Sequence, residues 1–137
     1  MIYKYRRVRT GSDILLPIET ETNPSAMTVK LRRTNARYRG LTPGQPYVVI
    51  GIEGDDFRIL NDAGRPYLYI PGLFEILDAR EPADWITELG DDGERYAYPA
   101  PLNEPGFFED FFDHKPKAVR TFWQVVNDRL ATAREVA

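Results

Sequence analysis

Carboxylates are the side chains in this sequence whose type and spacing could do chemistry. Glu109, Asp110 and Asp113 lie close together, and such a group could in principle hold Mg²⁺ for a hydrolytic reaction. An acidic cluster is more often a solvated face, however, and here four phenylalanines between residues 107 and 112 accompany it. Apolar anchors beside charged groups are typical of protein-recognition surfaces. We therefore expect this segment to bind a protein rather than to catalyse a reaction.

The arrangements that serve nucleophilic catalysis or cofactor binding are missing. The sequence has no cysteine and one histidine, His114, so neither a thiolate nor a histidine metal site is expected. A Ser-His-Asp triad would need His114 with Ser12 or Ser25, and neither serine stands in a nucleophile-elbow motif. Gly51 and Gly54 lack the lysine and the following helix of a phosphate-binding loop. We expect a non-enzymatic protein with no cofactor and no metal.

The net charge of −3 conceals an uneven distribution of charge along the chain. Residues 1–40 hold nine Lys and Arg against three Asp and Glu, residues 41–114 hold four against sixteen, and residues 115–137 hold five against two. This asymmetry predicts either a surface with one acidic face or basic ends that fold back on the acidic middle. The acidic middle argues against general nucleic-acid binding, which depends on Lys and Arg at the phosphates.

The sequence shows no sign of export or membrane insertion. No apolar run approaches the roughly 20 residues of a membrane-spanning helix. The segment from Met1 to Arg7 lacks the apolar core of a signal peptide. We expect a soluble, cytoplasmic bacterial protein that makes no membrane contact and is a monomer when free.

A chain of 137 residues has the size of a single domain, and we divide it into three parts. Residues 1–26 form an N-terminal extension or edge strands, residues 27–78 a small barrel, and residues 79–137 an aromatic and acidic segment with a C-terminal helix. The predicted fold class is α+β: mainly β, with a small β-barrel and a packed C-terminal α-helix.

The barrel is predicted from five short strands separated by turn signals. The strands cover residues 28–32, 47–52, 57–60, 67–70 and 73–77. Residues 53–56 and 61–64 are rich in Gly, Asn and Asp, which favour tight turns. Closing such strands into a barrel removes exposed sheet edges.

The remaining third predicts helices and a further strand. Residues 82–86 are compatible with a helix or an extended segment, and residues 96–98 with a strand. Pro116 suits the first turn of a helix, and apolar residues follow it at helical spacing on one face: Val119, Phe122, Trp123, Val126 and Leu130.

The aromatic residues of the strands allow two interpretations. Trp85 and Trp123 are expected in the core. Four tyrosines on neighbouring strands could line either the core or a groove: Tyr67, Tyr69, Tyr96 and Tyr98.

The order of motifs in the middle third resembles a known architecture. The residues concerned are Leu41-Thr42, Gly44, Tyr47 and Val49, then Phe57 to Ile59, Asn61-Asp62 and Gly64, then Tyr69, Pro71 and Leu73 to Glu75. This segment, about residues 28–78, resembles the SH3-like barrel of small bacterial and phage-associated proteins. The resemblance implies a fold and not a function.

The C-terminal part, from Trp85 to Trp123, is similar in its order of aromatic and acidic motifs to immunity proteins of bacterial polymorphic toxin systems. We therefore expect an immunity-like or antitoxin-like protein that neutralises a cognate toxin, a basic protein domain, by direct binding. The residues expected to form the partner-binding surface are acidic or aromatic: Asp91, Asp92, Tyr96, Glu104, Phe108, Glu109, Asp110 and Asp113.

Two alternatives remain open at the level of sequence. The first is an SH3-like module that binds nucleic acid or a ribonucleoprotein through Arg and Lys residues of positions 6–39, although the acidic hairpins make nucleic acid the less favoured partner. The second is a phage-derived accessory or structural protein that assembles through the edges of its barrel.

Overall fold

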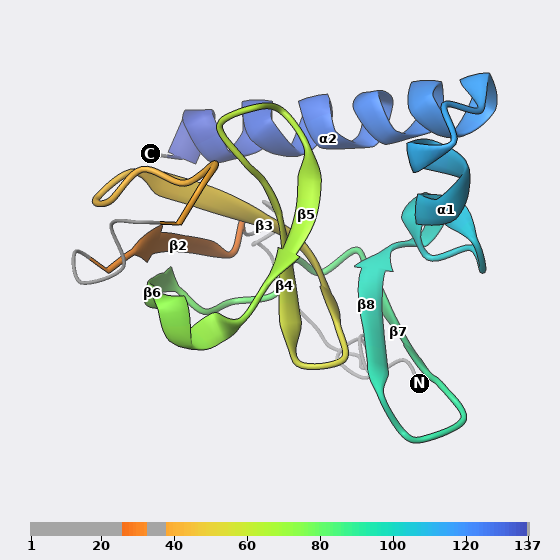
Figure 1. The fold of residues 1–137 in the computed structure, drawn as a ribbon, viewed down its shortest axis with the longest axis horizontal. Helices are drawn as coiled ribbons and strands as arrows, with labels where there is room; N and C mark the ends of the chain where they lie inside the picture. The colour runs from red at the N-terminus through yellow and green to blue at the C-terminus, as the bar shows by residue number, and fades with distance from the viewer. Residues whose placement is uncertain (1–25, 33–37, 137) are drawn as a thin grey trace, which may run out of the picture.

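The structure, a computed structural model, describes residues 26–32 and 38–136. Seven strands in this part of the chain pair antiparallel in one sheet, and two α-helices cover it (Figure 1). The predicted α+β class, mainly β with a C-terminal helix, is confirmed. The N-terminal extension predicted for residues 1–26 lies, apart from Ala26, outside the described residues.

The five predicted strands are present, and every boundary is within one residue of the prediction. They are β2 (Thr28–Leu31), β3 (Pro46–Glu53), β4 (Asp56–Leu60), β5 (Pro66–Tyr69) and β6 (Phe74–Asp78). A short 3-10 helix, η5 (Pro71–Leu73), precedes the last of them.

The order of these strands in the sheet is β5-β4-β3-β2-β6, so the first strand of the series pairs with the last. No pairing joins β5 to β6 among the described residues. Closure into a barrel, and the likeness to an SH3-like barrel, therefore stay predictions.

Burial along the strands follows from what covers each face. In β2, Val29 and Leu31 are buried and their neighbours less so, as alternation requires. In β3 the run from Val49 to Ile52 is buried without alternation. One reason is that β3 has a core on both faces, and another is that its register with β4 shifts between Val49 and Gly51. As a result, Val49 and Ile52 belong to one apolar cluster and Ile50 to the other.

A further hairpin pairs with the end of β3. It consists of β7 (Trp85–Leu89) and β8 (Arg95–Pro99), and Ala97 of β8 pairs with Ile52. Of residues 82–86, predicted as helical or extended, Trp85 and Ile86 are extended in β7, whereas Ala83 and Asp84 form a turn that the Trp85 N–H closes on the Pro82 carbonyl. A Cβ on Gly51 would lie 2.1 Å from the ring of Tyr98, so glycine is required where this hairpin crosses β3.

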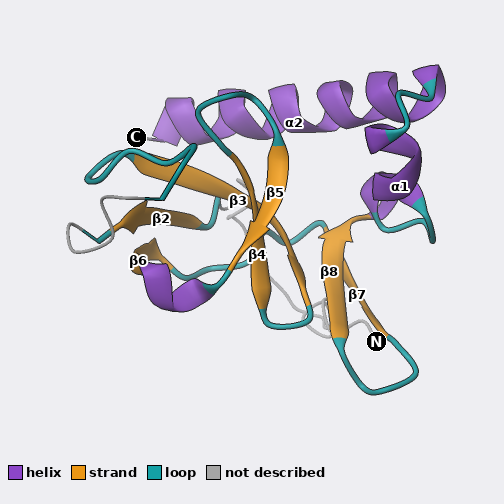
Figure 2. Cartoon of the chain, viewed as in Figure 1, coloured by secondary structure: helices purple, strands orange, loops and turns teal. Residues whose placement is uncertain are grey.

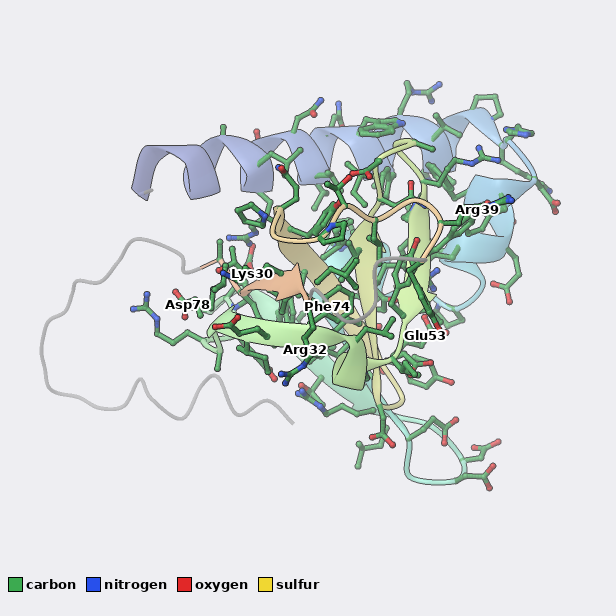
Figure 3. All side chains as sticks on the ribbon, turned by 60° about the vertical axis from the view of Figure 1, so that its left-hand side comes forward. Lys30, Arg32, Arg39, Glu53, Phe74 and Asp78 are labelled. Atoms are coloured by element: carbon green, nitrogen blue, oxygen red, sulfur yellow. The ribbon has the colours of Figure 1, made fainter. Side chains whose placement is uncertain are left out.

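The apolar interior has two parts. The first part is formed by side chains of the sheet strands and includes Val29, Ile59, Phe74 and Trp85, which are at most 2% exposed. Figure 3 shows Phe74 directed into the molecule, whereas the neighbouring Arg32 reaches outward. The second part lies under the helices.

Two helices complete the fold: α1 (Phe107–Phe112) and α2 (Pro116–Val136), with a short 3-10 helix, η6 (Ala100–Leu102), before them. Helix α2 runs across one side of the sheet and α1 lies beside β8 (Figure 2). The predicted apolar face of α2 packs inward, centred on Phe122 and Val126, with Trp123 partly buried at its margin. No helix among the described residues has the length and apolar character needed to cross a membrane.

Candidate functional site

A groove of about 740 Å³ lies between the β7–β8 hairpin and α1. Strands β3 and β4 contribute its floor through Glu53 and Arg58, the hairpin contributes Glu88 to Gly90, and residues between 102 and 113 form the opposite wall. The volume lies in the range of about 300–1,000 Å³ typical of ligand pockets. The groove is therefore the candidate functional site.

A hydrogen-bonded network of three side chains forms the floor of the groove. The Arg58 guanidinium, which is 5% exposed, donates to the Glu53 carboxylate at 2.7 Å and to the Tyr98 hydroxyl at 3.0 Å. The Tyr98 hydroxyl in turn donates to the same Glu53 oxygen at 2.8 Å. The Arg58 guanidinium also lies 3.9 Å from the centre of the Phe108 ring, a cation–π contact. The three side chains of the floor thus hold one another in place, and the Glu53 carboxylate balances the charge of the Arg58 guanidinium.

The rim, by contrast, carries carboxylates that no cation of the groove neutralises. Among the described residues that line the groove, Arg58 is the only Lys or Arg, and it forms an ion pair with Glu53. The lining holds four more acidic residues, all exposed: Glu88, Glu104, Glu109 and Asp113. Carboxylates gathered around a concave surface attract cations and raise their local concentration.

An exposed apolar side chain stands beside these carboxylates. Leu89, at the end of β7, lines the groove and is 69% exposed, the largest value among the exposed large hydrophobic residues. An exposed leucine near several carboxylates can bury its side chain against a partner protein, while the carboxylates form ion pairs with basic side chains of that partner.

Two tyrosines of β8 have shifted pKa values. Burial raises the pKa of the Tyr98 hydroxyl well above its usual range, against the opposing effect of Arg58. The hydrogen bond that Tyr96 donates to Glu94, 3.1 Å long, raises the pKa of Tyr96. Both hydroxyls are therefore donors at neutral pH, and neither is poised to act as a base.

The groove brings together five of the eight residues predicted to bind a partner. These are Tyr96, Glu104, Phe108, Glu109 and Asp113. The other three are exposed but do not line it: Asp91 and Asp92 lie in the turn of the β7–β8 hairpin, and Asp110 lies on α1.

Phe108 differs from the other residues that reach the groove. It is 9% exposed and packs against Tyr98 and Phe122 in the core under the helices. Phe107 and Phe111 are buried with it. The phenylalanines expected to serve as exposed anchors are thus mostly core residues, and the exposed apolar group of the site is Leu89.

Sequence reasoning missed Glu53, Arg58, Glu88 and Leu89. A signal existed for Arg58, because it interrupts the apolar run Phe57 to Leu60, where a charge is expensive unless it is paired. No local signal identified Glu53 as its partner, because the ion pair depends on the β3–β4 hairpin register.

The chemistry available in the groove is that of a cation-binding surface. Among residues 26–32 and 38–136 no group of three or more His, Cys, Asp and Glu side chains is placed to hold a metal ion. Oxygen acceptors and an apolar anchor are present at the rim, and they suit recognition of ammonium or guanidinium groups.

Comparisons with family models, with curated proteins and with solved structures gave no match. The site is therefore interpreted from its own geometry and charge.

Proposed function

We propose that this protein is a non-enzymatic binding protein that captures a basic partner protein through the acidic groove, in the manner of an immunity or antitoxin-like protein that neutralises a cognate toxin. The observation that carries the proposal is a set of four exposed rim carboxylates around a groove in which Arg58, the one Lys or Arg among the described lining residues, is already paired with Glu53. A lysine or arginine side chain of the partner would supply the positive charge that pairs with these carboxylates.

The geometry favours a protein partner over a small cation. The carboxylates come from β7, from the segment before α1 and from α1 and its end, so they are spread around the rim instead of converging on one point. Leu89 adds an apolar contact that a small hydrated cation would not use. A basic segment with both charged and apolar side chains matches the combination, and complementary charge would speed its association.

The experiment is affinity capture from the native lysate with tagged wild-type protein and with the double variant Glu104→Lys, Glu109→Lys. Both side chains are exposed, so the variant should fold. We expect one basic protein to bind the wild type at low salt and to be lost from the variant. Purified complex should lose affinity as salt rises, because rim ion pairs are screened.

Two results would contradict the proposal. If the captured protein binds the double variant as tightly as it binds the wild type, the groove is not the binding surface. If only nucleic acid is recovered, the neutralising function is wrong.

A further inference from the structure

A second depression, of about 850 Å³, has the opposite character to the groove. It lies between the loop that begins at Tyr38 and the β4–β5 hairpin, and no residue lines both sites. Its described lining residues include two arginines, three tyrosines and no Asp or Glu: Arg39, Arg65, Tyr38, Tyr67 and Tyr69 are the side chains that matter here.

The floor of this depression is built by close backbone packing. Gly40 has φ of +83°, and a Cβ there would lie 2.9 Å from the Asn61 amide nitrogen. Asn61 is 8% exposed, donates to the Tyr69 hydroxyl at 3.1 Å, and accepts from the backbone N–H groups of Ala63 and Arg65. The loop and the hairpin are thus held in fixed relation, and the aromatic rings above them are preorganised.

The charged groups of the depression are available to a ligand. Arg39 and Arg65 are exposed, and neither forms an ion pair within the described part of the chain. The neighbouring Asp62 carboxylate accepts hydrogen bonds from the Thr42 and Tyr47 hydroxyls and does not pair with either arginine. Two guanidinium groups without an ion-pair partner attract an anion, and their fork of donors suits a phosphate.

The tyrosines indicate what else the ligand carries. Tyr38 is 41% and Tyr67 44% exposed, so their ring faces are only partly used by the protein. Tyr38 lies against Tyr69 with ring centres 6.5 Å apart, and Tyr67 stacks on Phe112 at 5.8 Å. Rings supported in this way from behind can stack a planar base on the open side.

We propose that this tyrosine–arginine face binds a nucleotide unit, its base stacked on Tyr38 and its phosphate at Arg39 or Arg65. The unit is either a free nucleotide or part of a single strand, because a paired base in a duplex cannot offer its face to a tyrosine. An acidic peptide would satisfy the arginines but would leave the rings without a partner. The site shares none of its described lining residues with the acidic groove and does not rest on the partner proposed there.

The test is fluorescence anisotropy of the full chain with a labelled oligothymidylate of about ten nucleotides. Residues 1–25 contain four Lys and Arg, which could attract any polyanion, so dependence on a ring is the decisive readout. We expect Tyr38→Ala to weaken binding about tenfold and Tyr38→Phe to leave it within about twofold of wild type. Arg65→Ala should weaken binding and lower the slope of log affinity against log salt by about one.

Controls separate the sources of binding. Arg120→Ala removes an exposed arginine of α2 outside the depression and should bind as wild type does. Competition by AMP would support a free nucleotide as the ligand, and Tyr38-dependent binding that AMP does not displace would support a strand segment. Melting temperatures of all variants show whether each is folded.

Three outcomes overturn the proposal. One is the absence of binding at low salt. Another is binding that heparin displaces fully and that Tyr38→Ala leaves unchanged, which reflects charge alone. The third is displacement by polyglutamate as effective as that by unlabelled oligonucleotide, which would assign the face to acidic peptides.

Discussion

The guanidinium of Arg58 and the hydroxyl of Tyr98 meet at 3.0 Å in the interior, although forty positions separate them in sequence. Glu53 accepts from both groups with one carboxylate oxygen. The three side chains come from β4, β8 and β3, so they fix the β7–β8 hairpin against the central strands. The groove floor therefore depends on a polar network in which each side chain forms hydrogen bonds with the other two.

Removing Glu53 should destabilise the fold more than removing Arg58. Glu53→Ala leaves a guanidinium, 5% exposed, without its carboxylate, and we expect a cost of about 3 kcal/mol. Arg58→Met leaves Glu53, whose side chain is 32% exposed and can stay hydrated, but it also removes the donor to the buried Pro66 carbonyl at 2.9 Å. Its cost should therefore be smaller by about 1 kcal/mol at most. Urea unfolding measures both. Equal costs would show that the buried charge is compensated elsewhere, and Glu53→Gln, which keeps an acceptor, is the matched control.

Stability should fall at alkaline pH because of Tyr98. Burial raises the pKa of its hydroxyl in the folded state above the unfolded value of about 10. A raised pKa means that the neutral form is favoured by folding, so its stabilisation is complete below about pH 10 and is lost as the pH rises through the folded pKa. Tyr47 adds to this loss, since burial and then its hydrogen bond to Asp62 raise its pKa.

Unfolding free energies of wild type and Tyr98→Phe at a series of alkaline pH values check this. The variant should be less stable at neutral pH by about 1–3 kcal/mol, because the Arg58 Nε–H loses its acceptor. Its stability should decline less steeply above about pH 10. Parallel curves for the two proteins would contradict the assignment to Tyr98.

The strands were predictable because their signals are local. Turn residues at 53–56 and 61–64 separate runs of β-forming residues, and these turns set the boundaries of the strands on either side. Residues 82–86 were ambiguous because Pro82 and Asp84 suit a helix start as well as a loop, and only pairing with β8 decides the outcome. The predicted acidic residues of the site could be found from composition. Their relation to Arg58 and Glu53 could not, because it arises from contacts between distant strands.

Charge reversal at the groove should affect binding and not folding. Glu104→Lys and Glu109→Lys replace exposed carboxylates that line the groove, so we expect slower association with a basic partner and little change in melting temperature. Glu75→Lys makes the same change of charge on β6, at an exposed position outside the groove. It also removes the exposed ion pair between Glu75 and Lys30, 3.8 Å long, which contributes little to stability. Stopped-flow association rates at two salt concentrations compare the three variants. Equal slowing by Glu75→Lys would indicate a general effect of net charge.

The junction between α1 and α2 offers a stabilising substitution. His114 has φ of 62°, in the left-handed region, and the N–H groups of His114 and Lys115 bond to the carbonyls of Phe111 and Asp110. This is the pattern of a helix end at which glycine is preferred. His114→Gly should raise the free energy of unfolding by about 0.5–1 kcal/mol, measured by urea unfolding. A loss of stability would mean that the imidazole makes a contact worth more than the backbone strain.

The two neighbouring aromatic residues of α2 should differ in their effect on stability. Helical spacing places both Phe122 and Trp123 on the apolar face, but periodicity does not reveal where the centre of that face lies. Phe122 is completely buried among Phe108, Phe111 and the helix, whereas Trp123 is only partly buried. Phe122→Ala should cost about 3–5 kcal/mol because it opens a cavity. Trp123→Ala should cost less, because the surface it exposes is already partly hydrated. If thermal unfolding ranks the two variants in reverse, the apolar face of α2 is centred on Trp123 and not on Phe122.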